Sequence, residues 1–190
     1  MHGVYAVVDT PCGKMFVSEI ENALCAVSFN PDIDDAIRIL HFSYPLVQFT
    51  EGHVSSAENV RFCRGFVLFN GRKKGEILRL LNGEESTENI RISKLVFMRC
   101  SEFQRKVYEH LMRIPRGSTK SYAEVRNDII TVAKSIGHPT AYRAVARACR
   151  DNFLAVVIPC HRVVTSDGSL RGYRWGIEVK KKLLEMERKK

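Results

Sequence analysis

The chain contains an unbroken apolar run, Leu154-Ala155-Val156-Val157-Ile158, that ends at Pro159 and is followed by Cys160, His161 and Arg162. Such a run is typical of a buried strand, and Pro159 ends it because proline cannot donate to a strand ladder. The next side chains are therefore expected at a strand end, where a thiol beside an imidazole favours nucleophilic chemistry. The alternative is a structural cysteine, since cysteine is commonly buried, but His161 and Arg162 would then need partners in a core.

The composition is that of a soluble globular protein. The chain has 190 residues, of which 45% are hydrophobic and 27% charged, enough for one sizeable domain or two small ones. It has no apolar run long enough to span a membrane, and its N-terminus lacks the features of a secretory signal. We therefore expect a nuclear or cytoplasmic protein with no membrane partner.

The six cysteines predict free thiols. They include no Cys-x-x-Cys pair, which argues against a zinc ribbon or a redox dithiol. A reducing compartment favours unpaired cysteines, so one of them would be available to react. Residues 1–30 show no obvious set of cysteine and histidine ligands, and we predict neither a metal nor a cofactor.

The net charge of +9 comes from the second half of the chain. Residues 1–100 contain 11 Lys and Arg against 12 Asp and Glu, whereas residues 101–190 contain 19 against 9. A concentrated positive surface indicates a polyanionic partner for the second half. A solvated basic face on an ordinary enzyme would have the same composition, so charge alone does not separate the two interpretations.

The first half is predicted to be a strand meander with one helix. Strands are expected at 3–9, 14–20 and 24–29, followed by an amphipathic helix at 32–40 that begins after Pro31. The pattern is weak from 42 to 94. There, 60–70 and 76–81 carry apolar positions, and the glycine-containing segments 71–75 and 82–85 are expected to be loops.

The second half is predicted to be mostly helical. Ser101 is expected to cap one helix and Ser121 a second, with Glu124 as its capping-box partner. The segment 136–139 breaks this second helix, and Thr140 opens a third at 141–149. Because the third helix combines alanines with arginines, the pair outlines a helix-turn-helix, although a plain helical hairpin is the alternative. A final helix is expected at 177–187, with Val179, Leu183, Leu184 and Met186 as its apolar positions.

The predicted fold class is therefore α+β with two domains. Residues 1–99 would form a small mixed α/β domain with an antiparallel meander. Residues 100–190 would form a mostly helical domain that carries the helix-turn-helix and places Cys160 at the end of a strand.

Several motifs follow one another in a fixed order between residues 100 and 187. They are Phe103-Gln104 with Val107, Ser121-Tyr122, Arg143-Ala144-Val145, Asn152, Pro159-Cys160-His161-Arg162-Val163, Gly172-Tyr173-Arg174-Trp175-Gly176, and Lys182-Leu183-Leu184 with Glu187. In these motifs the sequence resembles the O6-alkylguanine-DNA alkyltransferases, also called methylated-DNA–protein-cysteine methyltransferases. The Pro-Cys-His-Arg core is highly specific to that family, whereas residues 1–99 match it only loosely, through the meander.

The resemblance implies a single-turnover DNA repair protein. An alkyl group would leave the O6 position of guanine, after base flipping, and stay on the sulfur of Cys160. O4-alkylthymine is a second candidate substrate, and the sequence does not say whether it is accepted. By the same resemblance His161 takes the thiol proton through a water, Glu187 orients His161, and Asn152 is similar to the family's hinge asparagine.

The resemblance also implies residues that bind the flipped base. Tyr122 would donate a proton to the base and rotate its phosphate, and Tyr173 would cover the pocket. The backbone amide of Arg174 would lie near guanine O6. The backbone carbonyls of Cys160 and Val163 would accept from the exocyclic amine of guanine.

The expected partner is double-stranded DNA that contains O6-alkylguanine, bound through its minor groove by a monomer of this chain. Arg143 matches the arginine that fills the vacated base stack. The helix that carries it, with Ala144 and Arg147, would dock in the groove. The stretch 126–132 looks like an insertion that lengthens or bulges the preceding helix.

Three other classes of function compete with this interpretation. A lesion sensor without repair activity would fit only if the insertion blocks the chemistry, because Cys160 is present. A cysteine hydrolase would use the same Cys–His–Glu arrangement, but no oxyanion site is evident in the sequence. A transcription regulator would use the helix-turn-helix alone, although that helix pair lies inside a region of catalytic appearance.

Trp175 stands where many family members have a small glycine, and we predict that it limits the size of the alkyl group. A bulky indole at the pocket lip would disfavour large O6 substituents such as benzyl. Trp175→Gly is therefore expected to increase the rate of reaction with O6-benzylguanine, measured as loss of free Cys160 thiol. No gain in rate would disprove this assignment.

Overall fold

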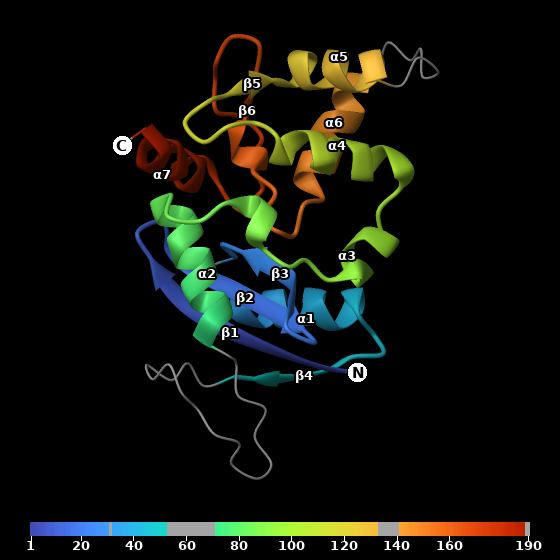
Figure 1. Cartoon of the computed structure of the whole chain (residues 1–190), viewed down its shortest axis with the longest axis vertical. Coiled ribbons are helices and arrows are strands. Elements are labelled where there is room, and N and C mark those ends of the chain that lie inside the picture. Colours follow the sequence, from blue (N-terminus) through green and yellow to red (C-terminus); the bar gives the residue numbers. More distant parts are fainter. Residues whose placement is uncertain (31, 53–70, 133–140, 189–190) are drawn as a thin grey trace.

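The computed structural model describes residues 1–30, 32–52, 71–132 and 141–188. A sheet with one helix on its outer side forms one layer, and most of the second half of the chain lies on the other side as a helical layer (Figure 1). The α+β class predicted from the sequence is thus confirmed. In the part of the chain that is described, no helix is both long and apolar enough to cross a membrane.

The predicted meander forms three antiparallel strands, β1 (His2–Thr10), β2 (Gly13–Ile20) and β3 (Ala23–Ser28). The loop between β2 and β3 has two residues, Glu21 and Asn22, both with positive φ, as in the turns that match the twist of a hairpin. A fourth strand, β4 (Gln48–Glu51), pairs in parallel with β1 and gives the sheet order β3-β2-β1-β4. The sequence did not predict β4, because it is short and mostly polar.

Helix α1 (Ile33–Ser43) covers one face of the sheet. The Asp32 side chain caps it by accepting from the Asp35 amide at 2.9 Å. Ala36 and Leu40 pack against Phe16 and Ile20 in a small hydrophobic cluster. The helix predicted at 32–40 is therefore confirmed and continues for one further turn.

The loop predicted at 71–75 is wrong, because these residues form the start of helix α2 (Gly71–Asn82). Three apolar side chains of this helix, Ile77, Leu80 and Leu81, are buried in the main core. Their tertiary packing outweighs the poor helix propensity of the two glycines. The apolar stretch predicted at 60–70 lies outside the described residues.

The predicted helices of the second half are confirmed where they are described. The short elements η1 (Thr87–Asn89) and α3 (Lys94–Met98) lead to α4 (Glu102–Met112), α5 (Tyr122–Val132), α6 (Ala141–Arg150) and α7 (Ile177–Arg188). Ser101 caps α4 in a capping box with Gln104. Ser121 and Glu124 form the second box, with hydrogen bonds of 3.2 and 2.7 Å.

The segment 126–132 is helical and completes α5, which packs against α6. Thr140 and the break predicted at 136–139 lie outside the described residues. Two short strands, β5 (Lys120–Ser121) and β6 (Val163–Val164), pair in parallel and join the start of α5 to the chain after Cys160.

The strand predicted at 154–158 is wrong, although the segment is fully buried. Leu154 makes an isolated parallel bridge to Val27 of β3, and the chain then turns, with Val156 at a φ of 71°. The amide of Ala155 donates to the Val27 carbonyl at 2.8 Å, and the amide of Ile158 donates to Leu154 at 2.9 Å. Because the backbone groups are satisfied locally and by β3, the apolar run is buried without joining a strand ladder.

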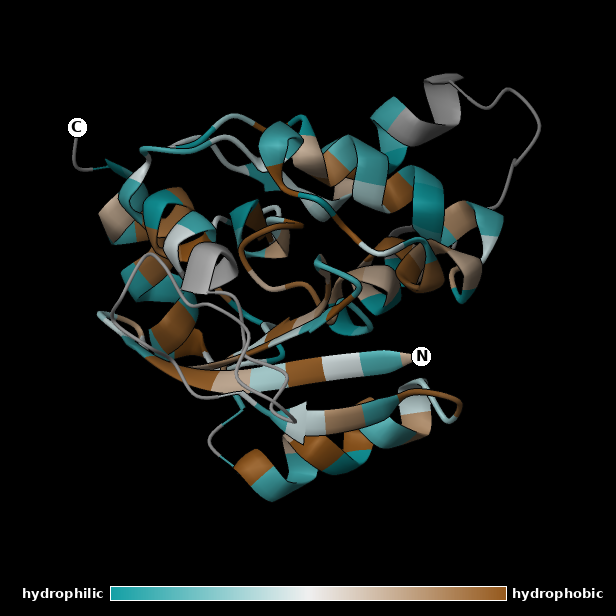
Figure 2. Ribbon diagram, turned by 60° about the horizontal axis from the view of Figure 1, so that its bottom comes forward, coloured by the Kyte–Doolittle hydropathy of each residue, from teal (hydrophilic) through white to brown (hydrophobic). Residues whose placement is uncertain are grey.

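Cys160 therefore lies in a short 3-10 helix, η2 (Cys160–Arg162), and not at a strand end. Hydrophobic parts of the ribbon gather between the sheet and the helical layer, around this central segment (Figure 2). The main core draws on both halves of the chain, including Val4, Leu24, Val107 and Leu183. The division at residues 99 and 100 stays a prediction, but the two parts share one hydrophobic core.

Leu154→Ala is expected to lower the free energy of unfolding by about 2–5 kcal/mol, because the side chain is fully buried where β3 meets the central segment. Urea denaturation measures this change. Leu46→Ala is the matched control, since Leu46 is 88% exposed, and it is expected to change stability by less than about 0.5 kcal/mol. Equal effects of the two substitutions would contradict the placement of Leu154.

Candidate active site

Cys160 is buried and held by Asn152. The Nδ2 group of Asn152 donates to the Cys160 sulfur at 3.1 Å and to the Ile158 carbonyl at 2.9 Å. The Oδ1 atom of the same amide accepts from the Leu154 amide at 2.9 Å. Asn152 thus fixes the turns that carry the thiol, and its donation to sulfur favours a thiolate.

Burial raises the pKa of the Cys160 thiol above its ordinary value, whereas the Asn152 hydrogen bond and the positive charge of Lys180 act in the opposite direction. The raised pKa means that the thiol is protonated at neutral pH. A nucleophilic reaction at this sulfur therefore needs a base that removes the proton.

His161 and Glu187 lie in contact, as the sequence predicted. The Nε2 atom of His161 is 2.8 Å from the Glu187 carboxylate, and the imidazole is fully buried. Burial lowers the pKa of His161, so the ring is neutral at neutral pH. Since Glu187 accepts the Nε2 proton, Nδ1 carries the lone pair, and Nδ1 has no hydrogen-bond partner within the described ranges.

Arg162 stabilises the negative charge of Glu187. Its Nε and Nη2 groups donate to the two carboxylate oxygens at 3.0 and 2.8 Å, and its Nη1 group donates to the Ile114 carbonyl at 2.7 Å. Burial alone would raise the pKa of Glu187, but the hydrogen bonds from His161 and Arg162 outweigh it and lower the pKa to about 2. Glu187 is therefore ionised and can hold His161 in one tautomer.

The tyrosines of the predicted site also meet near this centre. A Cβ atom at Gly172 would lie 3.7 Å from the Tyr122 hydroxyl, so the loop that carries Tyr173 runs beside the start of α5. Burial raises the pKa of both tyrosines, and both phenols can donate a proton or a hydrogen bond. The Tyr173 hydroxyl is buried, and no described residue hydrogen-bonds to it.

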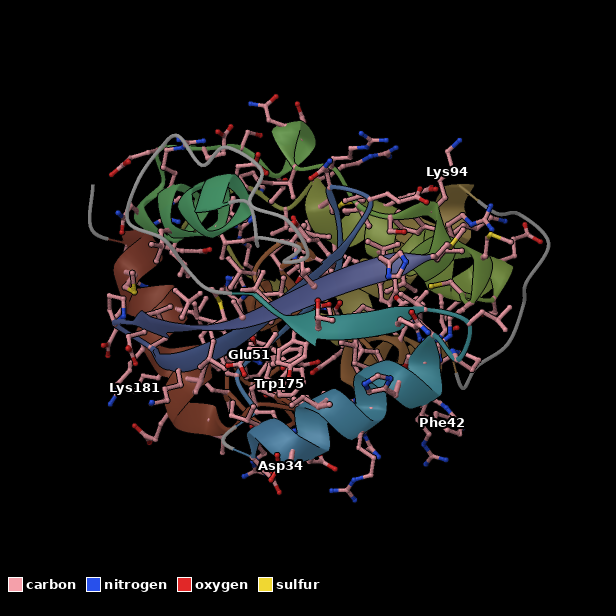
Figure 3. The ribbon with its side chains drawn as sticks, turned by 90° about the horizontal axis from the view of Figure 1, so that it is seen from below. Asp34, Phe42, Glu51, Lys94, Trp175 and Lys181 are labelled. Carbon is pink, nitrogen blue, oxygen red and sulfur yellow. The ribbon has the colours of Figure 1, made fainter. Side chains whose placement is uncertain are left out.

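Arg174 and Trp175 lie on the side of the loop that faces the sheet layer. The Arg174 guanidinium stacks over Phe153 at 4.3 Å and over Trp175 at 4.9 Å, and it donates to the Arg150 carbonyl at 2.9 Å. Trp175, labelled in Figure 3, lines a cavity of about 200 Å³ with Asn152 and with residues of β2, β3 and α1. Its influence on large alkyl groups stays a prediction.

Helix α6 presents the residues that the sequence assigned to DNA. Arg143, Ala144 and Arg147 are exposed, whereas Val145 and Ala148 are buried against the core. Arg147 also lies 3.6 Å from Asp151 in a surface ion pair. The exposed face of α6 is therefore basic and lined with a small side chain, as docking on a polyanion requires.

The sequence analysis gave no role to two buried cations near Cys160. It expected Arg162 to need a partner if buried but did not name Glu187 as that partner, and it did not single out Lys180. The signal for Lys180 was present, because the buried side of α7 consists of Lys180, Leu183, Leu184 and Glu187, a helical stripe with a charge at each end. Val179 and Met186, expected on that stripe, are only half-buried.

The five described cysteines are free, as predicted. Cys160 is set apart from the other described cysteines by its neighbours: an amide that donates to sulfur, a neutral imidazole and a buried carboxylate. No metal-binding cluster of histidine, cysteine or acidic side chains occurs in the described segments.

Comparison with known proteins finds relatives of the second half and of nearly the whole chain. A family model described as 6-O-methylguanine DNA methyltransferase, DNA binding domain, matches residues 102–189. The regulatory protein Ada of Salmonella typhimurium is 36% identical over 187 residues, which are 98% of this chain and 46% of that protein. A methylated-DNA–protein-cysteine methyltransferase of Methanosarcina barkeri is 46% identical over 87 residues, which are 46% of this chain and 51% of that protein.

Among solved structures, the O6-methylguanine methyltransferase of Mycobacterium tuberculosis has a TM-score of 0.68 and 26% identity, covering 98% of this chain and 93% of that one. The chain spans about half the length of the curated relatives that it matches. The fold and the site define a class of protein that has a buried cysteine at its centre and a second half that matches a DNA-binding domain. The chain belongs to the 6-O-methylguanine DNA methyltransferase family.

The stability that Glu187 contributes is expected to depend on pH. Its pKa is about 2 in the folded protein against an ordinary value of 4.5, so this contribution is present above pH 4.5 and is lost as the pH falls toward about 2. Urea denaturation of the native chain and Glu187→Gln should therefore give a difference in stability that shrinks across that window.

Glu185→Gln is the control, because Glu185 lies exposed on the same helix. Its difference from the native chain is expected to stay small at every pH. A Glu187→Gln difference that is constant between pH 4.5 and the acid limit would show that the carboxylate is not held ionised by His161 and Arg162.

Proposed function

We propose that this chain is a methylated-DNA–protein-cysteine methyltransferase that repairs O6-alkylguanine in DNA by transferring the alkyl group to Cys160. The observation that carries the proposal is the buried arrangement of Cys160, His161 and Glu187, in which Nδ1 of a neutral imidazole is open to accept a proton. Membership of the family and the names of its relatives support the same activity.

The reaction is a displacement at carbon. The thiol proton of Cys160 passes through a water to His161 Nδ1, and the sulfur then attacks the alkyl carbon. The S–C bond forms as the O6–C bond breaks, and the electron pair of that bond goes to guanine O6. Tyr122 supplies a proton to the base, and the proton held on His161 restores the phenol. Glu187 stays ionised throughout and stabilises the transient imidazolium.

The thioether product explains why the reaction would occur once per molecule. The S–C bond of a thioether is stable toward ordinary nucleophiles, and the sulfur that carries the alkyl group is only 4% exposed. The guanine leaves as an ordinary base, whereas the alkyl group stays on the protein. The reaction thus consumes the acceptor.

The partner in this proposal is double-stranded DNA. The exposed face of α6, with Arg143, Ala144 and Arg147, would enter the minor groove, and the basic second half would contact phosphates. Because Cys160 is buried in the protein, the target nucleotide has to leave the duplex to reach it. Arg143 would then occupy the space left in the base stack.

The test is transfer of a labelled methyl group from O6-methylguanine duplex DNA to the purified chain. The label is expected to reach a plateau of a single methyl per protein and to be absent from Cys160→Ala. Cys100→Ala is the control, since Cys100 is another free thiol but follows α3 and is not part of η2, and it should retain full transfer. Tight DNA binding without transfer would identify a lesion sensor instead, and ester hydrolysis with turnover would identify a hydrolase.

A further inference from the structure

Lys180 of α7 is a charged side chain with no access to solvent. Its exposed fraction is 0%, and its Nζ group donates to the backbone carbonyl of Val163 at 2.6 Å. Val163 directly follows η2, so the ammonium is fixed beside the segment that carries Cys160. Burying an ammonium group is costly unless a negative charge lies near it.

The buried carboxylate of the site does not supply that negative charge. Glu187 is already neutralised by Arg162, which donates to both of its oxygens. His161 is neutral, because burial lowers its pKa. Among these buried groups, the positive charge of Lys180 is therefore the one without a paired carboxylate.

Burial lowers the pKa of Lys180, whereas the two acidic groups that interact with it electrostatically, the thiols of Cys160 and Cys149, raise that pKa. Cys149, on α6, is nearly fully buried, and desolvation raises its pKa well above the ordinary value. Cys160 differs from it in two respects: its sulfur accepts a hydrogen bond from Asn152, and it is adjacent to His161. Cys160 is thus the thiol that can ionise beside Lys180.

We propose that Lys180 is a positioning residue whose buried ammonium is the fixed counter-charge for the thiolate of Cys160. The inference rests on the proposed function, because it concerns the same sulfur. The Val163 carbonyl holds the ammonium in place, and Lys180 keeps its proton during the reaction. The thiol proton goes to His161, and the negative charge on sulfur is consumed when the S–C bond forms.

The other groups around Cys160 do not replace this charge. Tyr108, Tyr122 and Tyr173 face the thiol as neutral phenols, and burial raises the pKa of each. Arg174 is the second cation near Cys160, but its guanidinium is only half-buried and lies over two aromatic rings. Lys180 lowers the pKa of Cys160 more than Arg174 does, although burial remains the largest influence and raises it.

Two substitutions separate the charge from the hydrogen bond. Lys180→Gln keeps a donor for the Val163 carbonyl and removes the charge, whereas Lys180→Met removes both. Lys181→Gln is the control, because Lys181 is the next residue of α7 and is exposed (Figure 3). Circular dichroism and urea denaturation establish that each variant is folded.

The measurement is the pH profile of two rates at Cys160: methyl transfer from O6-methylguanine DNA, and modification by methyl methanethiosulfonate followed by peptide mass spectrometry. Both Lys180 variants are expected to react about tenfold more slowly than the native chain at neutral pH, because loss of the positive charge raises the pKa of the Cys160 thiol. Their rates should approach the native rate at alkaline pH. Lys181→Gln should follow the native profile.

Native profiles in both folded variants would overturn the inference. So would a native profile in Lys180→Gln with a loss in Lys180→Met, because the hydrogen bond alone would then be sufficient. Because the thiol reagent needs no DNA, a native chain that reacts with it but transfers no methyl group would refute the proposed function and leave the counter-charge measurable.

A measurement on Lys180 itself covers the case in which its variants do not fold. Nuclear magnetic resonance of the Lys180 side chain gives its titration in the native chain and in Cys160→Ser. Loss of the thiolate is expected to lower the pKa of Lys180, and an unchanged titration would overturn the inference.

Discussion

The buried carboxylate of Glu187 joins the parts of the chain on which the site depends. It lies on the last turn of α7, yet it accepts from His161 and Arg162 of η2 and, at 3.3 Å, from the Gly117 amide before β5. An ionised carboxylate is stable in this interior only because a guanidinium and an imidazole share its charge. The same contacts dock the terminal helix and set the tautomer of His161, so fold and chemistry depend on one group.

The sheet layer contributes to this arrangement without supplying a reacting group. The amide of Val27 in β3 donates to the Phe153 carbonyl at 2.7 Å, and the Val27 carbonyl accepts from Ala155. These bonds hold the buried turns of 153–158 from one side while Asn152 holds them from within. The position of the thiol therefore depends on a strand more than 130 residues away in sequence.

Predictions from the local sequence were correct where neighbouring residues determine the secondary structure. The caps at Ser101 and Ser121, the meander and the basic α6 all follow from neighbouring residues, and the structure agrees with them. Such predictions were wrong where burial in the core determined the backbone conformation. Apolar residues at 154–158 predicted a strand, but a run that is apolar on every side can equally be a buried turn. Glycines at 71 and 75 predicted a loop, but the apolar side chains that follow them anchor a helix.

The sequence by itself determined the candidate nucleophile, its histidine, the family and the basic helix, because each is written in a contiguous motif or in local composition. Only the tertiary structure decided which charges share the interior. Arg162 of η2 pairs with Glu187 of α7, whereas the Nζ group of Lys180 on the same helix binds, among the described residues, only a backbone carbonyl, and this difference depends on long-range packing. The helical spacing of Lys180 with Leu183 and Leu184 is compatible with burial, but only the packing of the whole fold shows that this lysine is removed from water.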